Sequence, residues 1–287
     1  MSVSVVIAHW YPERERNLTR VVDAFWQGTQ QPDEVLIWDN TGRLEPGYFP
    51  HAAVLRSPWN VGCKAKFLGA LMCHSDYVYL SDNDLVVQAD TIRHMLTFAQ
   101  PDRILTLEGH LLDSTRSYAA SKTIQYNFVT TLSPVHTLNC RTDLLPRNLL
   151  KQLLPDIPFD DTTIAMHEDL WLAASAQKHN VPRLVVPGNT QQGFTRLSEH
   201  GVGMSVTDTL VHDGHSIDDR QRDLGRKPNS SDCCWTPIVE GHCSRCDNPL
   251  FPAGYAMKRS HYEDRERFTH QLFDPLPLSI KSTTWLT

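Results

Sequence analysis

The chain has 287 residues and a formal net charge of −6 at pH 7, and its residues are 21% charged and 40% hydrophobic. This composition excludes an intrinsically disordered protein, a collagen and a coiled coil. The negative charge also argues against a protein that coats nucleic acid through its whole surface. No window holds 18 consecutive apolar residues, and no basic leader precedes the short apolar run at the N-terminus, so we expect neither a membrane span nor a signal peptide. The cysteines number seven, and three of them stand singly (Cys63, Cys73 and Cys140); an odd count of this kind indicates a reducing, cytoplasmic location.

Residues 3–190 alternate strand and helix patterns. Apolar, β-branched runs predict buried strands, in chain order residues 3–8, 34–38, 53–55 and 77–80. Apolar residues at helical spacing follow Pro12 and run through residues 66–72, and they predict the intervening helices. Strands that alternate with helices imply an α/β protein with a mostly parallel sheet.

Acidic residues follow two of these strands, at the sheet edge where parallel sheets bind ligands. Asp39 begins the segment Asp39-Asn40-Thr41-Gly42, which would serve equally well as an Asx turn. Asp82 and Asp84 flank Asn83, and two carboxylates this close repel each other unless a cation neutralises them. Mg²⁺ or Mn²⁺ on oxygen ligands, shared with substrate phosphates, is the cation that this pattern predicts.

A second acidic pair, Glu168 and Asp169, stands at the start of a predicted helix, ten residues after Pro158. The helix dipole favours carboxylates there, so these residues could simply cap the helix. The alternative is catalysis, because a carboxylate can remove a proton from an attacking hydroxyl group.

The order of these segments resembles that of the GT-A glycosyltransferases, most closely their family 2-like branch. The likeness covers about residues 3–190, from the first strand through Asp39-Asn40-Thr41-Gly42, Asn60-Val61-Gly62 and Asp82-Asn83-Asp84 to Glu168-Asp169. It implies a GT-A (Rossmann-like) fold, a nucleoside diphosphate sugar as donor, expected to be a UDP-sugar, and Mn²⁺ or Mg²⁺ as cofactor. The usual D-D-G-S reads Asp39-Asn40-Thr41-Gly42 here, and the usual acid between the two metal-binding aspartates is Asn83. Neither departure removes a group that can act as a ligand.

The resemblance also implies roles for individual residues. The donor site would comprise Ala8, His9, Tyr11, Asp39, Asn60, Gly62, Lys64, Asp82 and Asn83. The metal would be held by Asp82 and Asp84 and completed by a downstream histidine; His200, His212 and His215 are candidates, and His212 and His215 are our choice. Asp169 would be the catalytic base, with Glu168 as the alternative.

The chemistry follows from these groups without the family. A leaving nucleoside diphosphate carries about two negative charges, which a metal can neutralise as a Lewis acid. Arg56, Lys64 and Lys66 form a basic stretch without acids that could assist, or could lie on a solvated helix face. One base opposite the leaving phosphate implies in-line displacement with inversion, which suits the oxocarbenium-like transition state of glycosyl transfer.

We expect a catalytic domain over residues 1–215, with the nucleotide sugar bound by residues 1–90 and the acceptor by residues 91–215. Residues 216–287 would form an extension that begins with a polar linker and ends in a tail packed on the catalytic domain. Four cysteines of this extension lie within 14 residues and could form a structural zinc knuckle; they are Cys233, Cys234, Cys243 and Cys246. Unrelated thiols and redox use are the alternatives.

Residues 110–151 carry five Lys or Arg and two Asp residues, a net +3 that suggests an anionic acceptor. Residues 59–67 are similar to enzymes that glycosylate hydroxymethylated pyrimidines in DNA, which must extrude the base. In that interpretation Arg116 and Lys122 hold phosphates and Tyr118 or Tyr126 holds the base, while Phe128 is expected in the core. A glycan acceptor is the second interpretation, and a non-catalytic nucleotide-binding α/β module is the third.

Overall fold

A computed structural model describes most of residues 1–197 and part of the C-terminal region. The described residues are 1–9, 14–58, 61–118, 120–159, 167–188, 193–197, 203–204, 238–239, 242–243 and 259–277.

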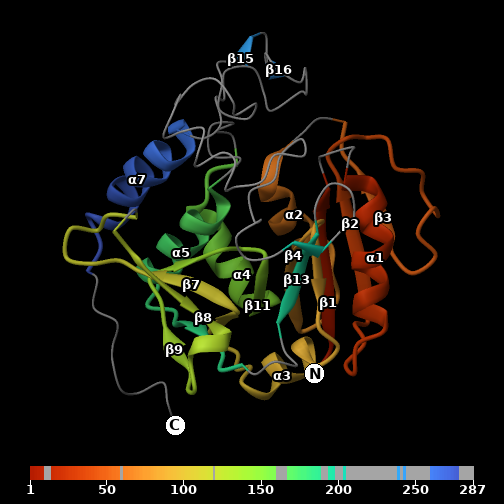
Figure 1. Ribbon diagram of the computed structural model, residues 1–287, viewed down its shortest axis with the longest axis horizontal. Coiled ribbons are helices and arrows are strands. Elements are labelled where there is room, and N and C mark those ends of the chain that lie inside the picture. The colour runs from red at the N-terminus through yellow and green to blue at the C-terminus, as the bar shows by residue number, and fades with distance from the viewer. Residues whose placement is uncertain are drawn as a thin grey trace.

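An eight-stranded sheet with the strand order β3-β2-β1-β4-β11-β6-β12-β9 forms the centre of the fold (Figure 1). The strands β3, β2, β1 and β4 are mutually parallel, as are β6 and β12, whereas β11 and β9 run antiparallel to their neighbours. The bounds are β1 (Val3–His9), β2 (Glu34–Asp39), β3 (Ala53–Arg56), β4 (Tyr77–Asp82), β6 (Ile104–Thr106), β9 (Ser133–Pro134), β11 (Thr142–Pro146) and β12 (Arg183–Val185). The α/β class with a large, mostly parallel sheet is therefore confirmed.

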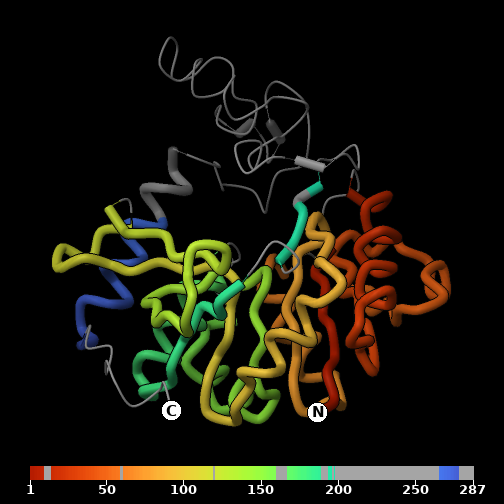
Figure 2. Tube along the Cα trace, turned by 60° about the horizontal axis from the view of Figure 1, so that its bottom comes forward, coloured from red at the N-terminus to blue at the C-terminus, as the bar shows by residue number. Residues whose placement is uncertain are grey.

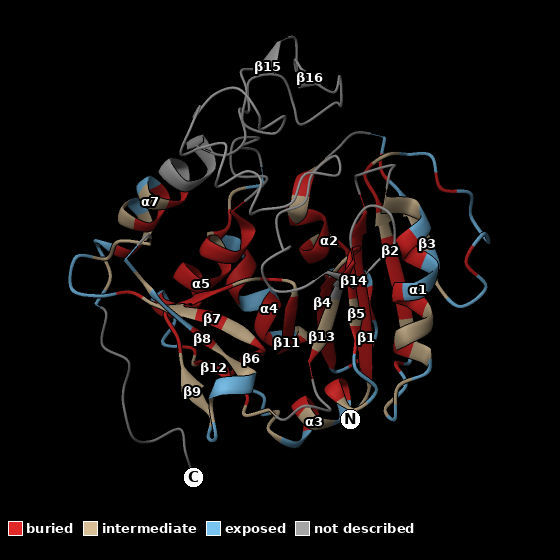
Figure 3. Cartoon of the chain, in the orientation of Figure 1, coloured by how far each residue is buried: buried red, intermediate tan, exposed pale blue. Residues whose placement is uncertain are grey.

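Helices cover both faces of this sheet, and β1 shows why its sequence is apolar throughout. Val6 joins the hydrophobic core beneath α2, α4 and α5, whereas Val5 and Ile7 join the core beneath α1 and α3. Every residue of β1 is buried (Figure 3), as expected for a strand covered on both faces. The bounds are α1 (Glu15–Trp26), α2 (Ala65–Met72), α3 (Thr91–Thr97), α4 (Arg147–Leu153), α5 (Glu168–Lys178) and α7 (Arg259–Phe273).

Smaller elements lie around this framework. One small sheet has the order β10-β7-β8, a second has β14-β13-β5 and a third has β15-β16. Their bounds are β5 (Leu85–Val87), β7 (Glu108–Leu111), β8 (Lys122–Gln125), β10 (Thr137–Leu138), β13 (Phe194–Leu197), β14 (Gly203–Met204), β15 (Ile238–Val239) and β16 (His242–Cys243). Among the described residues there are also three 3₁₀ turns: η2 (Gly62–Lys64), η3 (Tyr126–Phe128) and η4 (Leu154–Asp156).

The carboxyl ends of β1, β2 and β4 meet at one edge of the large sheet. Ala8 pairs in register with Asp82, and His9 pairs with Asp39. The N-terminus, from which β1 begins, lies at the opposite edge (Figure 2). The sheet therefore brings the predicted strand-end residues together.

Helix α7 packs against α5, although the sequence assigns it to the extension. Phe268 contacts Leu170 of α5, Phe273 is fully buried in the large core, and Gln177 Nε2 donates a hydrogen bond of 2.6 Å to the Pro277 carbonyl oxygen. The predicted packing of the tail is thus observed as far as Pro277. The boundary at residue 216 stays a prediction. Within the described residues, no helix has both the length and the apolar character that crossing a membrane requires.

Candidate active site

His9 ends β1 as a buried, neutral imidazole. Burial lowers its pKa to about 4, with the charge of Arg14 adding to the shift and that of Asp39 opposing it. The Asn83 side-chain nitrogen lies 2.9 Å from His9 Nδ1, so the hydrogen-bond network assigns the ring proton to Nε2. Nε2 is buried and has no hydrogen-bond partner among the described residues. A buried donor without a partner is costly.

Asp39 ends β2 and holds the following turn together. Its Oδ1 accepts hydrogen bonds from the backbone nitrogen and the hydroxyl of Thr41, and its Oδ2 accepts one from the backbone nitrogen of Leu44. Asp39 is fully buried. These are the contacts of an Asx turn, so the structure shows the turn-forming role, and contact with a nucleobase stays a prediction.

Asn40 ties this turn to the Asn60-Val61-Gly62 segment. Its side chain donates to the Gly62 carbonyl oxygen (3.0 Å) and accepts from the Val61 backbone nitrogen (3.1 Å). Gly62 has φ +70°, a conformation that favours glycine. Asn60 itself lies outside the described residues, as does Tyr11.

The two aspartates after β4 each face a cationic side chain. Arg14 Nη1 lies 3.1 Å from Asp84 Oδ2, and Lys66 Nζ lies 2.7 Å from Asp82 Oδ1. Asp84 is buried, whereas the side chain of Asp82 is 36% exposed. Burial raises the pKa of Asp84, as does the charge of Asp82, and the charges of Arg14 and Arg141 oppose this rise. The repulsion between the aspartates is therefore relieved in part by the chain's own cations.

Lys66 links the Asp82 segment to the second acidic pair. Its ammonium group lies 2.7 Å from Asp82 Oδ1, 3.1 Å from Glu168 Oε1 and 2.5 Å from the Cys140 carbonyl oxygen. Burial alone would lower its pKa, but Asp82 and Glu168 raise that pKa well above the ordinary value. Gly69 allows α2 to pack closely on β1, because a Cβ at this position would lie only 2.6 Å from Val6 Cγ1.

The basic stretch is thus not the solvated helix face that the sequence allowed. Lys64 is also buried; its ammonium group donates to the Pro158 carbonyl oxygen at 3.1 Å and lies 5.8 Å from the centre of the Phe159 ring. Arg56 points to the loop after β2, where it pairs with Glu45 at 2.8 Å. All three cations therefore have partners within the chain.

Glu168 and Asp169 begin α5, as predicted, and both are buried. Burial raises the pKa of Glu168 to about 7, and the charges of Asp169 and Asp82 add to this rise, whereas Lys66 opposes it. Burial alone would also raise the pKa of Asp169, but Arg265 overcomes this effect and leaves that pKa below its ordinary value. The two adjacent carboxylates therefore differ in proton affinity because Arg265 outweighs the effect of burial at Asp169, whereas Lys66 does not outweigh it at Glu168.

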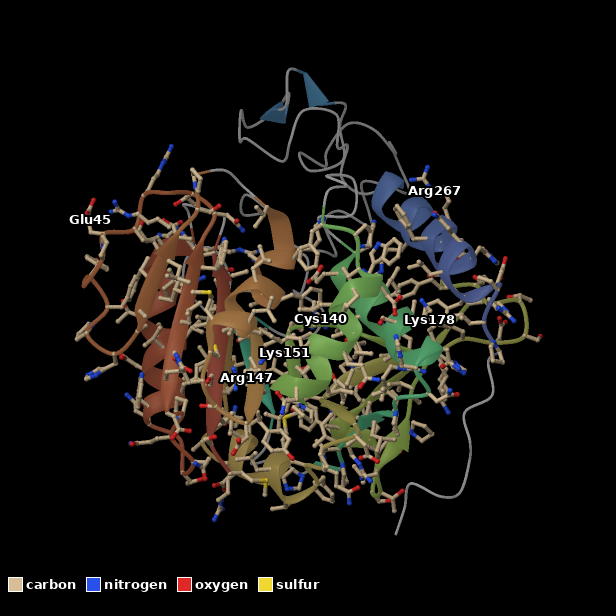
Figure 4. All side chains as sticks on the ribbon, turned by 180° about the vertical axis from the view of Figure 1, so that it is seen from behind. Glu45, Cys140, Arg147, Lys151, Lys178 and Arg267 are labelled. Atoms are coloured by element: carbon tan, nitrogen blue, oxygen red, sulfur yellow. The ribbon has the colours of Figure 1, made fainter. Side chains whose placement is uncertain are left out.

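Arg265 comes from α7, which passes beside α5 and carries the labelled Arg267 in Figure 4. Its Nη2 lies 2.5 Å from Asp169 Oδ2 and its Nη1 lies 3.3 Å from Asp169 Oδ1. The guanidinium also lies 4.3 Å from the centre of the Tyr118 ring. The Tyr118 hydroxyl in turn lies 3.0 Å from His110 Nε2. Tyr118 therefore contacts the guanidinium group that holds Asp169.

The other predicted acceptor residues lie further out. Lys122 is exposed on β8, and Arg116 Nε lies 3.8 Å from Asp274 Oδ1. The prediction that Phe128 packs in the core is wrong: it is 78% exposed, because the η3 turn directs it outward while Tyr126 packs on both cores.

Several predicted ligands lie outside the described residues. They are His200, His212, His215, Cys233, Cys234 and Cys246, together with the side chain of Cys243. Within the described residues, no group of three or more His, Cys, Asp or Glu side chains is arranged to hold a metal ion. The histidine ligands and the zinc knuckle stay predictions.

Sequence reasoning missed two cations of this site, Arg14 and Arg265. Arg14 stands just before α1, in the turn after β1, and its place beside the sheet edge was a usable signal. Arg265 has no such signal, because 96 residues separate it from Asp169. A third cation, Arg141, was assigned to the acceptor region, but it pairs with Glu108 at 2.7 Å.

No known protein family has a profile that matches the sequence, and no curated protein matches it. Among solved structures, a crystal structure of S. aureus TarS 1–349 is 15% identical with a TM-score of 0.48, over 68% of this chain and 60% of that one. The same fragment in complex with UDP is 16% identical with a TM-score of 0.48, over 68% and 60%. A further structure of S. aureus TarS gives 16% and 0.47, over 68% and 36%. The chain thus spans less than two thirds of the length of these proteins.

Proposed function

We propose that this protein is a glycosyltransferase that moves a sugar from a nucleoside diphosphate sugar, a UDP-sugar, to an acceptor hydroxyl group. One observation carries the proposal: Lys66 contacts both Asp82 and Glu168. The donor motif and the acid pair, far apart in sequence, therefore face a single buried ammonium group. The unpartnered Nε2 of His9 at the same sheet edge adds a hydrogen-bond donor for the nucleotide.

The transfer needs two tasks from the chain. Residues at the ends of β1 and β4 hold the donor, with His9 and Asn83 as hydrogen-bonding groups and Asp82 toward the ribose. A carboxylate at the start of α5 accepts the proton of the acceptor hydroxyl while its oxygen attacks the sugar, which inverts the configuration. Asp169 is the base that the sequence predicts.

A divalent metal is not required for this proposal. The described part of the chain does not by itself fit one, because Asp82 and Asp84 already contact Lys66 and Arg14 and no third ligand is present there. The predicted Mn²⁺ or Mg²⁺ would need ligands from the region of His200, His212 and His215. We therefore assign no step to a metal.

The acceptor that we propose first is a hydroxymethylated pyrimidine in DNA, supported by the exposed Lys122 and by Arg116. Two of the five basic residues of this stretch are occupied elsewhere, since Arg141 pairs with Glu108 and Arg147, on α4 (Figure 4), donates to the carbonyl oxygens of Cys73 and Ser75. A glycan is the alternative acceptor. Incubation with UDP-sugars and either hydroxymethylated DNA or simple glycans distinguishes the two by which acceptor becomes labelled.

UDP titrated into the purified protein is expected to bind, and any affinity gained with Mn²⁺ over EDTA is expected to vanish in Asp84→Ala. Removal of this carboxylate takes away a predicted metal ligand and also the ion pair with Arg14, so circular dichroism checks that the variant is folded. Isothermal titration calorimetry measures both affinities. Asp102→Ala is the matched control, because Asp102 is exposed and lies before β6, at the opposite edge of the sheet.

Absence of UDP binding with and without Mn²⁺ would rule out the donor assignment. Equal UDP affinity in Mn²⁺ and in EDTA would show that no metal assists UDP binding, and the donor assignment would stand. Binding of UDP together with no sugar transfer to any acceptor would favour the non-catalytic nucleotide-binding module.

A further inference from the structure

The two carboxylates at the start of α5 differ in how their oxygens are occupied. Asp169 Oδ1 accepts from the Leu170 backbone nitrogen at 2.9 Å and from Arg265 at 3.3 Å, and its Oδ2 accepts from Arg265 at 2.5 Å. Both oxygens of Asp169 are therefore engaged. Among the described residues, Glu168 is contacted only at Oε1, by Lys66 at 3.1 Å. Its Oε2 is left to accept a proton.

We propose that Glu168, rather than Asp169, takes the proton of the acceptor hydroxyl, and that Arg265 is the positioning residue that keeps Asp169 out of this role. This inference rests on the proposed glycosyl transfer. A bidentate arginine–carboxylate pair is among the strongest polar contacts in proteins. A proton that binds a carboxylate held in this way removes its negative charge and so weakens the charge-assisted pair with Arg265.

The charges around each carboxylate agree with this geometry. Glu168 faces Lys66 of α2, Asp82 of β4, Cys63 of η2, Cys140 before β11 and its neighbour Asp169. Burial raises the pKa of Glu168 to about 7, close to the value at which a general base works best near neutral pH.

Asp169 has a different set of charged and titratable neighbours. They are Arg265 of α7, His167 before α5, Tyr118, His110 of β7, Asp143 of β11 and Glu168, together with the thiols of Cys63 and Cys140. Arg265 dominates the opposing charges and leaves the pKa of Asp169 lowered despite burial.

The proposed sugar transfer needs no reactant besides the UDP-sugar and the acceptor. The acceptor oxygen forms a bond to C1 of the sugar while the bond from C1 to the β-phosphate oxygen breaks. UDP leaves with the electron pair of that bond. The hydroxyl proton moves to Glu168 Oε2 and passes to water after the product leaves.

Arg265 connects α7 to the carboxylates at the start of α5. Its guanidinium contacts Asp169 and lies over the Tyr118 ring, and the Tyr118 hydroxyl lies within hydrogen-bond distance of His110 Nε2. Phe268, one turn further along α7, packs on Leu170 and lies 5.1 Å from the ring of His167, ring centre to ring centre. Helix α7 therefore fixes the first turn of α5, which carries both carboxylates.

The test compares Glu168→Gln with the pair variant Asp169→Asn/Arg265→Gln. The pair variant removes both charges together, which avoids leaving a buried charge without its partner. Turnover is measured as UDP release from UDP-glucose, UDP-galactose and UDP-N-acetylglucosamine with water as acceptor, across pH 5–9. Calorimetry with UDP reports donor affinity, and circular dichroism reports folding.

Glu168→Gln is expected to lower kcat by roughly 10²–10⁴-fold, with UDP affinity within about threefold, and to abolish the rise of kcat with pH near pH 7. The pair variant is expected to lose less kcat than Glu168→Gln, because some activity is lost when the first turn of α5 is held less firmly, and to keep that rise of kcat with pH. Asp169→Asn alone should melt at a lower temperature than the pair variant, because it leaves Arg265 buried without a carboxylate.

A pair variant that loses as much turnover as Glu168→Gln, or loses the pH dependence, would overturn the inference. So would a Glu168→Gln variant with wild-type turnover. In both cases the wild-type protein still releases UDP, so the proposed function stands. A wild-type protein that neither binds UDP nor turns over a UDP-sugar would overturn the function and this inference together.

Discussion

Lys66→Met is expected to lower the free energy of unfolding at pH 8 by about 3–5 kcal/mol, the usual cost of removing one partner from a buried ion pair. Methionine is about as long as a lysine side chain without its ammonium group, so the change removes the charge and little other volume. The side chain of Lys66 is 1% exposed and that of Glu168 is 6% exposed, so water cannot replace the lost contact. Asp82, at 36% exposure, is hydrated in part and contributes less.

The loss should be smaller at pH 5. In the wild-type protein the pKa of Glu168 is about 7, above its ordinary value of 4.5. A carboxyl group whose pKa is raised by folding contributes stability below the unfolded value and loses that contribution as pH rises through the folded value. Removal of Lys66 takes away the charge that opposes this rise. The variant therefore suffers most where Glu168 must be ionised, at pH 8, and least where it is protonated.

Urea unfolding of Lys66→Met at pH 5 and pH 8 measures this difference. Lys151→Met is the matched control, since Lys151 is an exposed lysine on α4, and it should change stability by less than about 0.5 kcal/mol. Equal effects of the two substitutions would show that the Lys66 ammonium group is not held as the structure describes.

The elements that position the site could be predicted because their signals are local. The apolar runs of β1, β2 and β4 reflect burial on both faces, and the rule that parallel strands present their carboxyl ends at one edge brings Asp39 and Asp82 together. The start of α5 at Glu168 follows from helical spacing and from acids in the first turn. Each of these features depends on a short stretch of chain.

The partners of the charged residues could not be predicted, because they depend on how distant segments pack. Lys66 contacts Asp82, Glu168 and the Cys140 carbonyl oxygen, which come from three separate elements. Spacing alone places Lys66 on a helix and says nothing of its burial. The Arg265–Asp169 pair joins α7 to α5, and nothing near residue 265 marks that contact. Such pairs decide proton affinity, and the ranking that the resemblance implies, with Asp169 before Glu168, takes no account of them.

Asp143 is a further charged residue whose burial could not be predicted from the sequence. This residue of β11 is fully buried, and its carboxylate oxygens make no hydrogen bond of regular geometry among the described residues. Burial raises its pKa from 3.8 to about 6; the side chains of Thr106 and Cys140 and the charge of Lys66 limit the rise. The ionised carboxylate is therefore held in the interior at a cost to stability.

Asp143→Asn is expected to raise the free energy of unfolding at pH 8 by about 1–3 kcal/mol, because each unit of pKa shift corresponds to about 1.4 kcal/mol. A carboxyl group with a raised folded pKa stabilises fully below its unfolded value, near pH 4, and loses that contribution as pH rises through about 6. The neutral amide has the same size and does not titrate. The two proteins should therefore have similar stability at pH 4 and diverge between pH 4 and pH 7.

Urea unfolding from pH 4 to pH 8 follows this divergence, with Asp102→Asn as the control because the side chain of Asp102 is 60% exposed. The control should track the wild-type protein at every pH. If Asp143→Asn were instead less stable at pH 8 than at pH 4 relative to the wild-type protein, the ionised carboxylate would have to be stabilised by a partner. Lys66 is the first candidate, because its charge already acts on Asp143. The Lys66→Met/Asp143→Asn double variant would then be more stable at pH 8 than the sum of the two single changes predicts, since residues that share a partner are not additive.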